Sequence, residues 1–267
     1  VSSLSPSRIE AGMVCPLRAT MHRIFTEEEL ALPLLRGRLL HAFAEAVALN
    51  VDSDVARLKI MDAYQEILAA PSWLRSYRLD TWRTVLDRTK MWIETHRHIF
   101  EQVGVEVEAE VTIAEGMKLR GRIDRLEKTM DGDYHIVDFK SGTNCPSKKA
   151  IADHVQLFTY QLILHHGAFD GTKIRPVRST ESGMTVDGAT LVYPEKDTKN
   201  IWSITQAAKT EEQLAEFENQ LPDLLQALRG PELQAQRNPR CATCKLKPIC
   251  PVFDTGKWTT EPTTNVS

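Results

Sequence analysis

The chain has 267 residues, of which 42% are hydrophobic and 26% are charged, and its formal net charge is −3. This length and composition predict a globular protein with one large domain or two small ones. The slightly acidic balance argues against a protein that coats nucleic acid non-specifically, although an enzyme can still hold DNA in one local basic groove. The sequence has no apolar run of the roughly 18 residues that a membrane helix needs, and its N-terminus lacks the pattern of a secretory signal. We therefore expect a cytoplasmic protein without a membrane partner.

Helices are predicted over most of the first hundred residues. Ser5-Pro6 is typical of a helix start, because a serine side chain caps free backbone N–H groups and proline fits the first turn. Apolar residues spaced by four predict a helix at about 34–49, which carries His41. A longer helical stretch covers about 54–100, with a break at Pro71. Its tryptophans are expected to pack in the core rather than to stack on bases: Trp73, Trp82 and Trp92.

The pattern then changes to one of strands. Apolar side chains alternate with polar ones in 103–113 and in 119–126, and an Asp-Gly-Asp turn leads to a third strand at about 134–140. These three strands are expected to form a meander. The remaining elements are a helix at about 149–166, a strand at about 189–193 and a helix at about 211–228. This order predicts an α+β, or mixed α/β, fold.

We expect a single domain over residues 1–253. Its helical part covers about 1–100, its core about 101–200, and a C-terminal helix with a cysteine-containing tail about 205–253. Residues 254–267 are expected to form a flexible tail.

Two aspartates and a lysine lie on two neighbouring predicted strands. Residues two apart on a strand point to the same face, so Asp138 and Lys140 face one side together, and the connecting turn brings Asp124 beside Asp138. Paired carboxylates repel each other unless a hard cation such as Mg²⁺ relieves the repulsion. A nearby lysine can stabilise charge on a phosphate or orient an attacking water. These are the groups that hydrolysis of a phosphodiester bond needs.

The alternative is a pair of solvated strand carboxylates beside a lysine, and the Asp138-x-Lys140 triplet alone favours it. The flanking residues Ile136, Val137 and Phe139 favour a site, because they are apolar and indicate a buried strand. Charges placed in such a strand cost free energy unless they are paired or bind a metal.

The motif Gly121-Arg122-Ile123-Asp124-Arg125, followed by Val137-Asp138-Phe139-Lys140-Ser141-Gly142, resembles the PD-(D/E)xK nuclease superfamily and, within it, the RecB-like branch. The resemblance extends from Leu4 to about Phe253. It implies a restriction-endonuclease-like core, in which helices flank a central mixed sheet, and a bound Mg²⁺ or Mn²⁺ ion.

The resemblance also implies roles for single residues. The metal ligands would be His41, Asp124, Asp138 and the backbone carbonyl of Phe139. Lys140 would be the catalytic lysine, acting with Asp124 and Asp138, and Gln156 and Tyr160 would position the DNA or the lysine. Without the resemblance, His41 reads as a structural histidine of an apolar helix. Glu110, on the strand before, is a further candidate acid.

Cys241, Cys244 and Cys250 form a compact set of thiolate ligands, and the distant Cys15 is the obvious fourth. Four cysteines suit zinc and an iron–sulfur cluster equally well on chemical grounds. One distant and three clustered cysteines around a RecB-like core resemble the iron–sulfur members of the family, which include AddB, the Adn helicase–nucleases and CRISPR adaptation nucleases. That resemblance implies a 4Fe–4S cluster that ties the two ends of the chain together. Cys145 is left over as a plain thiol.

The leading hypothesis is a metal-dependent deoxyribonuclease, an exonuclease on single-stranded or unwound DNA that works in DNA repair or recombination. The alternatives are a nuclease-like scaffold that binds DNA or docks a partner without cutting, and a zinc-stapled binding protein. The sequence contains no Walker loop of the G-x4-G-K-S/T kind, so we expect no motor in it. Many relatives are fused to helicases or partnered with them, so the expected partners are DNA and a helicase.

Overall fold

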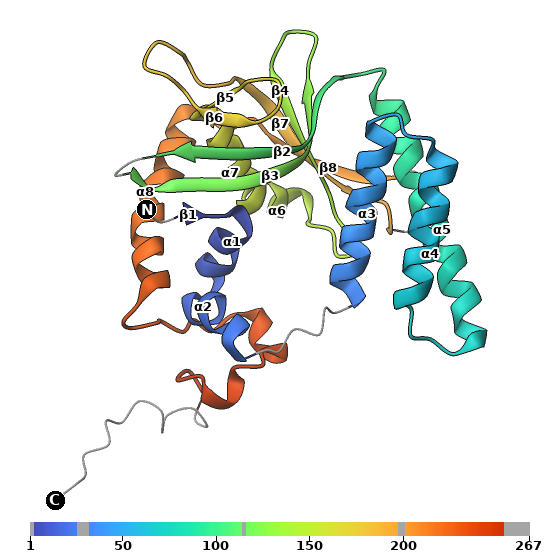
Figure 1. The fold of residues 1–267 in the computed structure, drawn as a ribbon. Helices are drawn as coiled ribbons and strands as arrows, with labels where there is room; N and C mark the ends of the chain where they lie inside the picture. Colours follow the sequence, from blue (N-terminus) through green and yellow to red (C-terminus); the bar gives the residue numbers. More distant parts are fainter. Residues whose placement is uncertain (1–2, 26–31, 114–115, 197–200, 254–267) are drawn as a thin grey trace, which may run out of the picture.

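The computed structural model describes residues 3–25, 32–113, 116–196 and 201–253 (Figure 1). The described helices are α1 (Pro6–Val14), α2 (Pro16–Phe25), α3 (Leu32–Ala48), α4 (Ser53–Ile67), α5 (Ser72–His96), α6 (Lys148–Ala152), α7 (Val155–His165) and α8 (Glu211–Arg229), with two short 3-10 helices, η2 (Pro239–Thr243) and η3 (Lys247–Ile249). The described strands are β1 (Ser3–Leu4), β2 (Glu101–Thr112), β3 (Lys118–Lys128), β4 (Tyr134–Phe139), β5 (Gly167–Phe169), β6 (Ile174–Pro176), β7 (Val186–Tyr193) and β8 (Trp202–Ala207). The expected C-terminal tail, 254–267, lies outside the described residues.

One mixed sheet forms the centre of the molecule, with the strand order β5-β6-β2-β3-β4-β7-β8. Strands β2, β3 and β4 form the antiparallel meander that the sequence predicts. Strand β7 then pairs parallel to β4 and antiparallel to β8, while the short β1 pairs parallel to β3. Helices flank the sheet, so the expected mixed α/β fold is confirmed.

Two hydrophobic cores lie against the two faces of the sheet. The larger one joins the sheet to α1, α7 and α8, and Ile136 of β4 belongs to it. The second joins α3, α4 and α5 to the sheet through Val137 and Phe139, which lie one and three residues after Ile136 on the same strand. Because successive side chains of a strand point to opposite faces, β4 contributes to both cores and is buried along almost its whole length.

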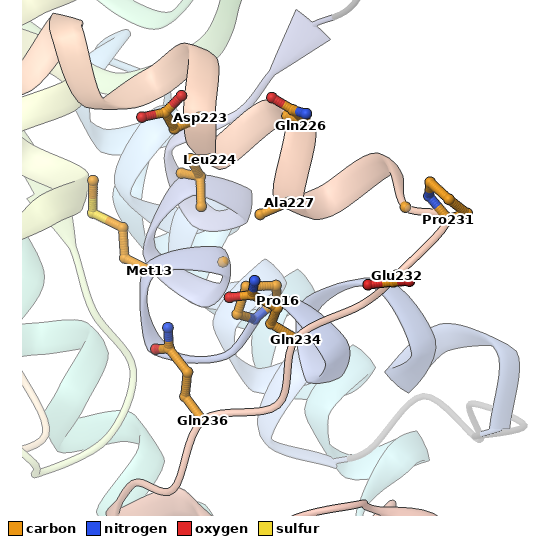
Figure 2. Close-up of a pocket in the computed structure, with 12 residues that line it drawn as sticks. Met13, Pro16, Asp223, Leu224, Gln226, Ala227, Pro231, Glu232, Gln234 and Gln236 are labelled. Carbon is orange, nitrogen blue, oxygen red and sulfur yellow. The ribbon is translucent and has the colours of Figure 1, made fainter. Parts of the chain in front are cut away.

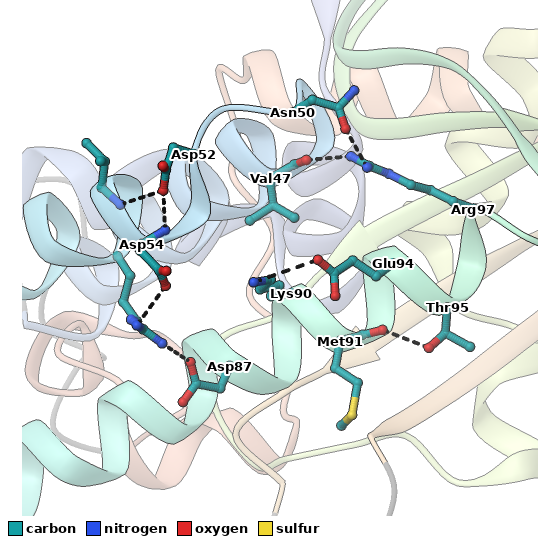
Figure 3. A network of polar contacts seen from close by, with 12 residues as sticks. Val47, Asn50, Asp52, Asp54, Asp87, Lys90, Met91, Glu94, Thr95 and Arg97 are labelled. Carbon is teal, nitrogen blue, oxygen red and sulfur yellow. Dashed lines mark hydrogen bonds and ion pairs between the residues drawn. The ribbon is translucent and has the colours of Figure 1, made fainter.

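Polar contacts fix the end of α3 against α5 (Figure 3). The guanidinium of Arg97 donates to the carbonyl oxygens of Val47 and Ala48 and to the side-chain oxygen of Asn50, which satisfies carbonyls that a helix end leaves free. Arg57 joins α4 to α5 through Asp87 at 2.8 Å. Helix α3 is therefore held in place at the end that follows His41.

The structure differs from the sequence-based expectations at several points. The helix expected at 149–166 is two helices: Asp153 caps the end of α6, and His154 caps the start of α7 by accepting from the backbone N–H of Leu157. Trp82 and Trp92 are buried as expected. The expectation that Trp73 packs in the core is wrong, since this residue is 77% exposed. The sequence patterns do not predict helix α2 or the strands β1, β5, β6 and β8. Among the described residues, no helix combines the length and apolarity needed to cross a lipid bilayer.

Candidate active site

Strands β3 and β4 separate at the two aspartates. Their ladder runs from Lys128 and Tyr134 to Arg125 and Val137, where the paired register ends. One residue further along β3, Oδ2 of Asp124 accepts a hydrogen bond from the backbone N–H of Phe139 at 2.7 Å. The carboxylate thus takes the place of a backbone acceptor, and both Asp124 and Asp138 are buried at the fork.

His41 reaches this fork from α3. Its Nδ1 lies 3.2 Å from Oδ1 of Asp124 and 3.8 Å from Oε1 of Glu106 on β2. Within the described parts of the chain, these three residues are the one group of three or more His, Cys, Asp or Glu whose ligand atoms all lie within 4.8 Å of one another. One imidazole and two carboxylates suit Mg²⁺ or Mn²⁺. The residues present therefore fit a divalent cation.

Glu106 is a site residue that sequence reasoning missed. Its φ of 49° lies in the left-handed region, which residues other than glycine seldom adopt, and such conformations gather at functional sites. The other candidate acid, Glu110, does not join this group, because its carboxylate contacts Lys118 and Arg120 instead. Glu106 and Glu110 lie on the same face of the same predicted strand, so the alternation of side chains does not distinguish them. Only the irregular backbone at Glu106 separates them.

The electrostatics of the group are those of a compact cation site. Burial alone would lower the pKa of His41, but its contacts with Asp124 and Glu106 raise it to about 10. Burial, together with the charge of Asp138, raises the pKa of Asp124 to about 6. Asp138 thus acts on both residues through its charge. Phe139, whose carbonyl the sequence assigned as a ligand, lines the same small cavity as His41, Glu106 and Asp124, whereas Asp138 does not line it.

Asp138 meets a second set of groups, on the side of α7. Its Oδ2 lies 2.7 Å from Nζ of Lys140, and its Oδ1 accepts from the side-chain amide of Gln156 at 3.0 Å. Lys140 in turn donates to Oε1 of Gln156 at 2.6 Å. Burial alone would lower the pKa of Lys140, but the charge of Asp138 raises it above its ordinary value, so the lysine is a cation at neutral pH.

Tyr160, one turn after Gln156, anchors α7 to β3. Its hydroxyl donates to the backbone carbonyl of Arg122 at 2.8 Å and lies 3.5 Å from the amide nitrogen of Gln156. Gly121 allows this approach, because a Cβ there would lie 3.0 Å from Cε1 of Tyr160. The tyrosine therefore sets the distance between α7 and the strand that carries Asp124.

The four predicted cluster cysteines line one cavity in the lower part of the molecule. Cys15 follows α1, and the other three come from the tail: Cys241 lies in η2, Cys244 follows η2, and Cys250 follows η3. The tail contacts the chain next to Cys15, since the backbone N–H of Leu17, in the first turn of α2, donates to the carbonyl of Gln234 at 3.0 Å. Figure 2 shows a neighbouring pocket, of about 580 Å³, which is lined by residues of α1, α8 and the segment 230–236.

Arg18 also lines the cysteine cavity, and its Nε is buried without a hydrogen-bond partner among the described residues. A buried N–H without an acceptor costs free energy. An anionic group that is held by the thiolates would supply that acceptor. The soft donor set and the unsatisfied guanidinium therefore fit a thiolate-bound metal centre.

Among the comparisons with known proteins, a family model gives the informative match. No curated protein matches the chain. A solved structure described as the crystal structure of SSO0001 is 16% identical and aligns with a TM-score of 0.38 over 92% of this chain and 95% of that one. The family model of the PD-(D/E)XK nuclease superfamily matches residues 3–251. Since that match spans the forked strands, the helix of His41 and the cysteine tail, the chain belongs to the PD-(D/E)XK nuclease superfamily.

Proposed function

We propose that the protein is a metal-dependent DNA nuclease that hydrolyses phosphodiester bonds at the fork between β3 and β4. The observation that supports this most strongly is the grouping of His41, Glu106 and Asp124, with ligand atoms within 4.8 Å, next to the Asp138–Lys140 pair. Members of this superfamily are usually metal-dependent nucleases. The same residues would have no reason to share a buried fork in a scaffold without chemistry, since each buried charge costs free energy.

The metal ligands in this proposal are His41, Asp124 and Glu106, together with the Asp138 carboxylate and the Phe139 carbonyl that the family resemblance implies. A divalent cation bound there would polarise a phosphate oxygen as a Lewis acid and would offset the negative charge on the leaving oxygen. Asp124 is oriented for this task, because Phe139 holds its Oδ2 while its Oδ1 faces His41. Arg122, whose Nε lies 2.7 Å from the carboxylate of Glu106, fixes the third ligand.

Lys140 is not the base in this scheme. Its raised pKa keeps the ammonium charged, so it orients the attacking water and stabilises charge on the phosphate. Gln156 bridges Lys140 and Asp138 and thereby sets the direction of both. Tyr160 positions Gln156 and α7 rather than taking part in proton transfer, because burial raises its pKa far above the neutral range.

A 4Fe–4S cluster on Cys15, Cys241, Cys244 and Cys250 completes the proposal. Four cysteines suit zinc and an iron–sulfur cluster equally well on chemical grounds. The arrangement of one distant and three clustered cysteines, which resembles the iron–sulfur members of the family, supports the cluster. Its role would be structural, joining α1 to the tail.

We further propose that the substrate is single-stranded or unwound DNA, that digestion is exonucleolytic, and that the enzyme works in DNA repair or recombination. Many of the nucleases that this sequence resembles are fused to helicases or partnered with them, so we propose that a helicase, fused to this chain or present as a separate subunit, unwinds the substrate.

The test is a digestion assay on anaerobically purified protein with Mg²⁺ or Mn²⁺. End-labelled single-stranded DNA, duplex DNA and RNA are compared, and iron and acid-labile sulfide are measured on the same sample. Metal-dependent shortening of single-stranded DNA from one end, with about four irons per chain, is the expected result. Zinc without iron would overturn the cluster, and a cluster-loaded protein that cuts none of the three substrates would overturn the nuclease.

A further inference from the structure

Two open pockets border the fork, and they share no residue. One, of about 610 Å³, is lined by His41, Glu106 and Arg122, on the side of the metal ligands. The other, of about 680 Å³, is lined by Lys140 and Gln156, on the side of the catalytic lysine. A strand whose phosphate sits at the fork must continue on both sides of it. The pocket beyond Lys140 therefore lies where the strand leaves the reacting phosphate.

The chemistry of this second pocket is distinct from that of the metal group. Its wall combines the ammonium of Lys196 with the side chains of Thr143, Asn144 and Tyr193. Nζ of Lys196 lies 4.4 Å from the ring centroid of Trp202, an attraction that fixes the ammonium in position. Between described residues, none of the ion pairs includes Lys196, whereas Lys140 is already paired with Asp138. Lys196 is thus the cation that this pocket offers to a phosphate.

His154 also lines the pocket and brings a hydrogen-bonding ring to it. Its Nδ1 accepts from the backbone N–H of Leu157, so the neutral ring carries its proton on Nε2. Burial lowers the pKa of His154, which favours that neutral form. The one carboxylate in the lining, Glu10, faces Arg240 at 3.5 Å, and this pairing reduces its repulsion of a phosphate.

We infer that the pocket beyond Lys140 binds one nucleotide of the substrate strand, with the Lys196 ammonium on its phosphate and the amide of Asn144 and the imidazole of His154 beside its base. The volume lies in the range of small-molecule sites and admits a single nucleotide more readily than a base pair. The inference rests on the proposed function for the identity of the strand. It adds a recognition site that stands apart from the metal ligands.

Cys145 gives a readout of the pocket that does not require cutting. Its half-buried thiol lines the pocket, so a bound nucleotide would shield it from alkylation. The anaerobically purified full-length chain is treated with iodoacetamide in EDTA, with and without saturating oligothymidylate, and labelling of the Cys145 peptide is followed by mass spectrometry. Binding of the same oligonucleotide, with a fluorescent label, is measured by anisotropy at several salt concentrations for the wild type, Lys196→Ala and Lys173→Ala. Lys173 is exposed near the far edge of the sheet and serves as the matched control.

We expect the oligonucleotide to slow labelling of Cys145 at least fivefold. Lys196→Ala should weaken binding and reduce the slope of log K against log salt by about 0.7, the value for one phosphate contact of a single strand. Lys173→Ala should leave both unchanged. If saturating oligonucleotide leaves Cys145 labelling unchanged, or if Lys196→Ala keeps the wild-type salt slope, the inference is overturned. If the oligonucleotide protects Cys145 from alkylation but the protein cuts no DNA with Mg²⁺ or Mn²⁺, the proposed function is overturned and the nucleotide site is supported.

Discussion

The backbone N–H of Phe139 donates to Oδ2 of Asp124 at 2.7 Å, and this bond stands where the ladder between β3 and β4 ends. It leaves Oδ1 of Asp124 facing His41 at 3.2 Å. The fork between the strands is thus closed by a side chain that also belongs to the candidate metal group. A change that displaces Asp124 will therefore affect both the metal site and the joint between the two strands.

Glu106 should matter to metal binding, and Glu110 should not. Glu106→Gln removes a charged ligand that lies 3.8 Å from His41, so we expect the affinity for Mn²⁺ to fall about tenfold or more. Glu110→Gln is the matched control, because that side chain contacts Lys118 and Arg120 on the neighbouring strand. Titration calorimetry with Mn²⁺ measures both. If the two variants bind Mn²⁺ with equal affinity, Glu106 is not a metal ligand.

Glu127 should be needed for stability. It is fully buried and pairs with Arg125, itself 1% exposed, at 2.5 Å between Oε1 and Nε. Glu127→Gln leaves the guanidinium without a countercharge, so the free energy of unfolding should fall by about 3 kcal/mol. In the control, Glu181→Gln breaks the more exposed pair with Arg175 and should lower the free energy of unfolding much less. Chemical denaturation compares the two, and similar losses would contradict the prediction.

His96 should make the fold sensitive to acid. Burial, with the charge of Arg125, lowers the pKa of its imidazole to about 4, whereas the unfolded value is about 6.5. Between these pH values the unfolded chain takes up a proton that the folded chain does not, so stability is lost as the pH falls from about 6.5 to about 4.

His96→Phe isolates this effect, because it keeps an aromatic ring between Trp92 and Phe100 and removes the titration. The free energy of unfolding of the variant, relative to the wild type, should increase as the pH falls through that window. A difference that stays constant with pH would show that His96 does not titrate as described.

Arg18 should protect the cysteine site. Its buried Nε lies at the cavity without a hydrogen-bond partner among the described residues. We expect Arg18→Met to lose the visible absorbance of the proposed cluster in air several times faster than the wild type, because the thiolate-bound group loses a charged donor. Arg8→Met changes an exposed arginine of α1 and should behave as the wild type. Equal rates in both variants would remove Arg18 from the site.

Much of the fold could be predicted from the sequence, since the period of two in β2, β3 and β4 is strong and the helices α3, α5 and α8 are long. The short edge strands β5 and β6 have three residues each, too few to show a period. The break before α7 depends on a capping contact of His154, and histidine is not a usual capping residue. The exposure of Trp73 could not be predicted, because composition does not show which face of a helix packs against no other element.

The candidate site was predictable only in part. The structure brings His41 to Asp124, and it brings Lys140, Gln156 and Asp138 together. Glu106 could not be found by pattern, because its place depends on a left-handed backbone that the alternation does not reveal. Spacing along the chain determines which face a residue takes, but tertiary packing determines which acid meets the histidine.

The most direct test of the central claim compares the wild type with Asp138→Ala in a metal-dependent digestion of single-stranded DNA. Asp138 lies between Lys140 and Gln156 and acts through its charge on Asp124 and His41, so its loss should reduce cutting by at least about 10³-fold. Circular dichroism and iron content should match the wild type. Cutting by Asp138→Ala at the wild-type rate would contradict the account.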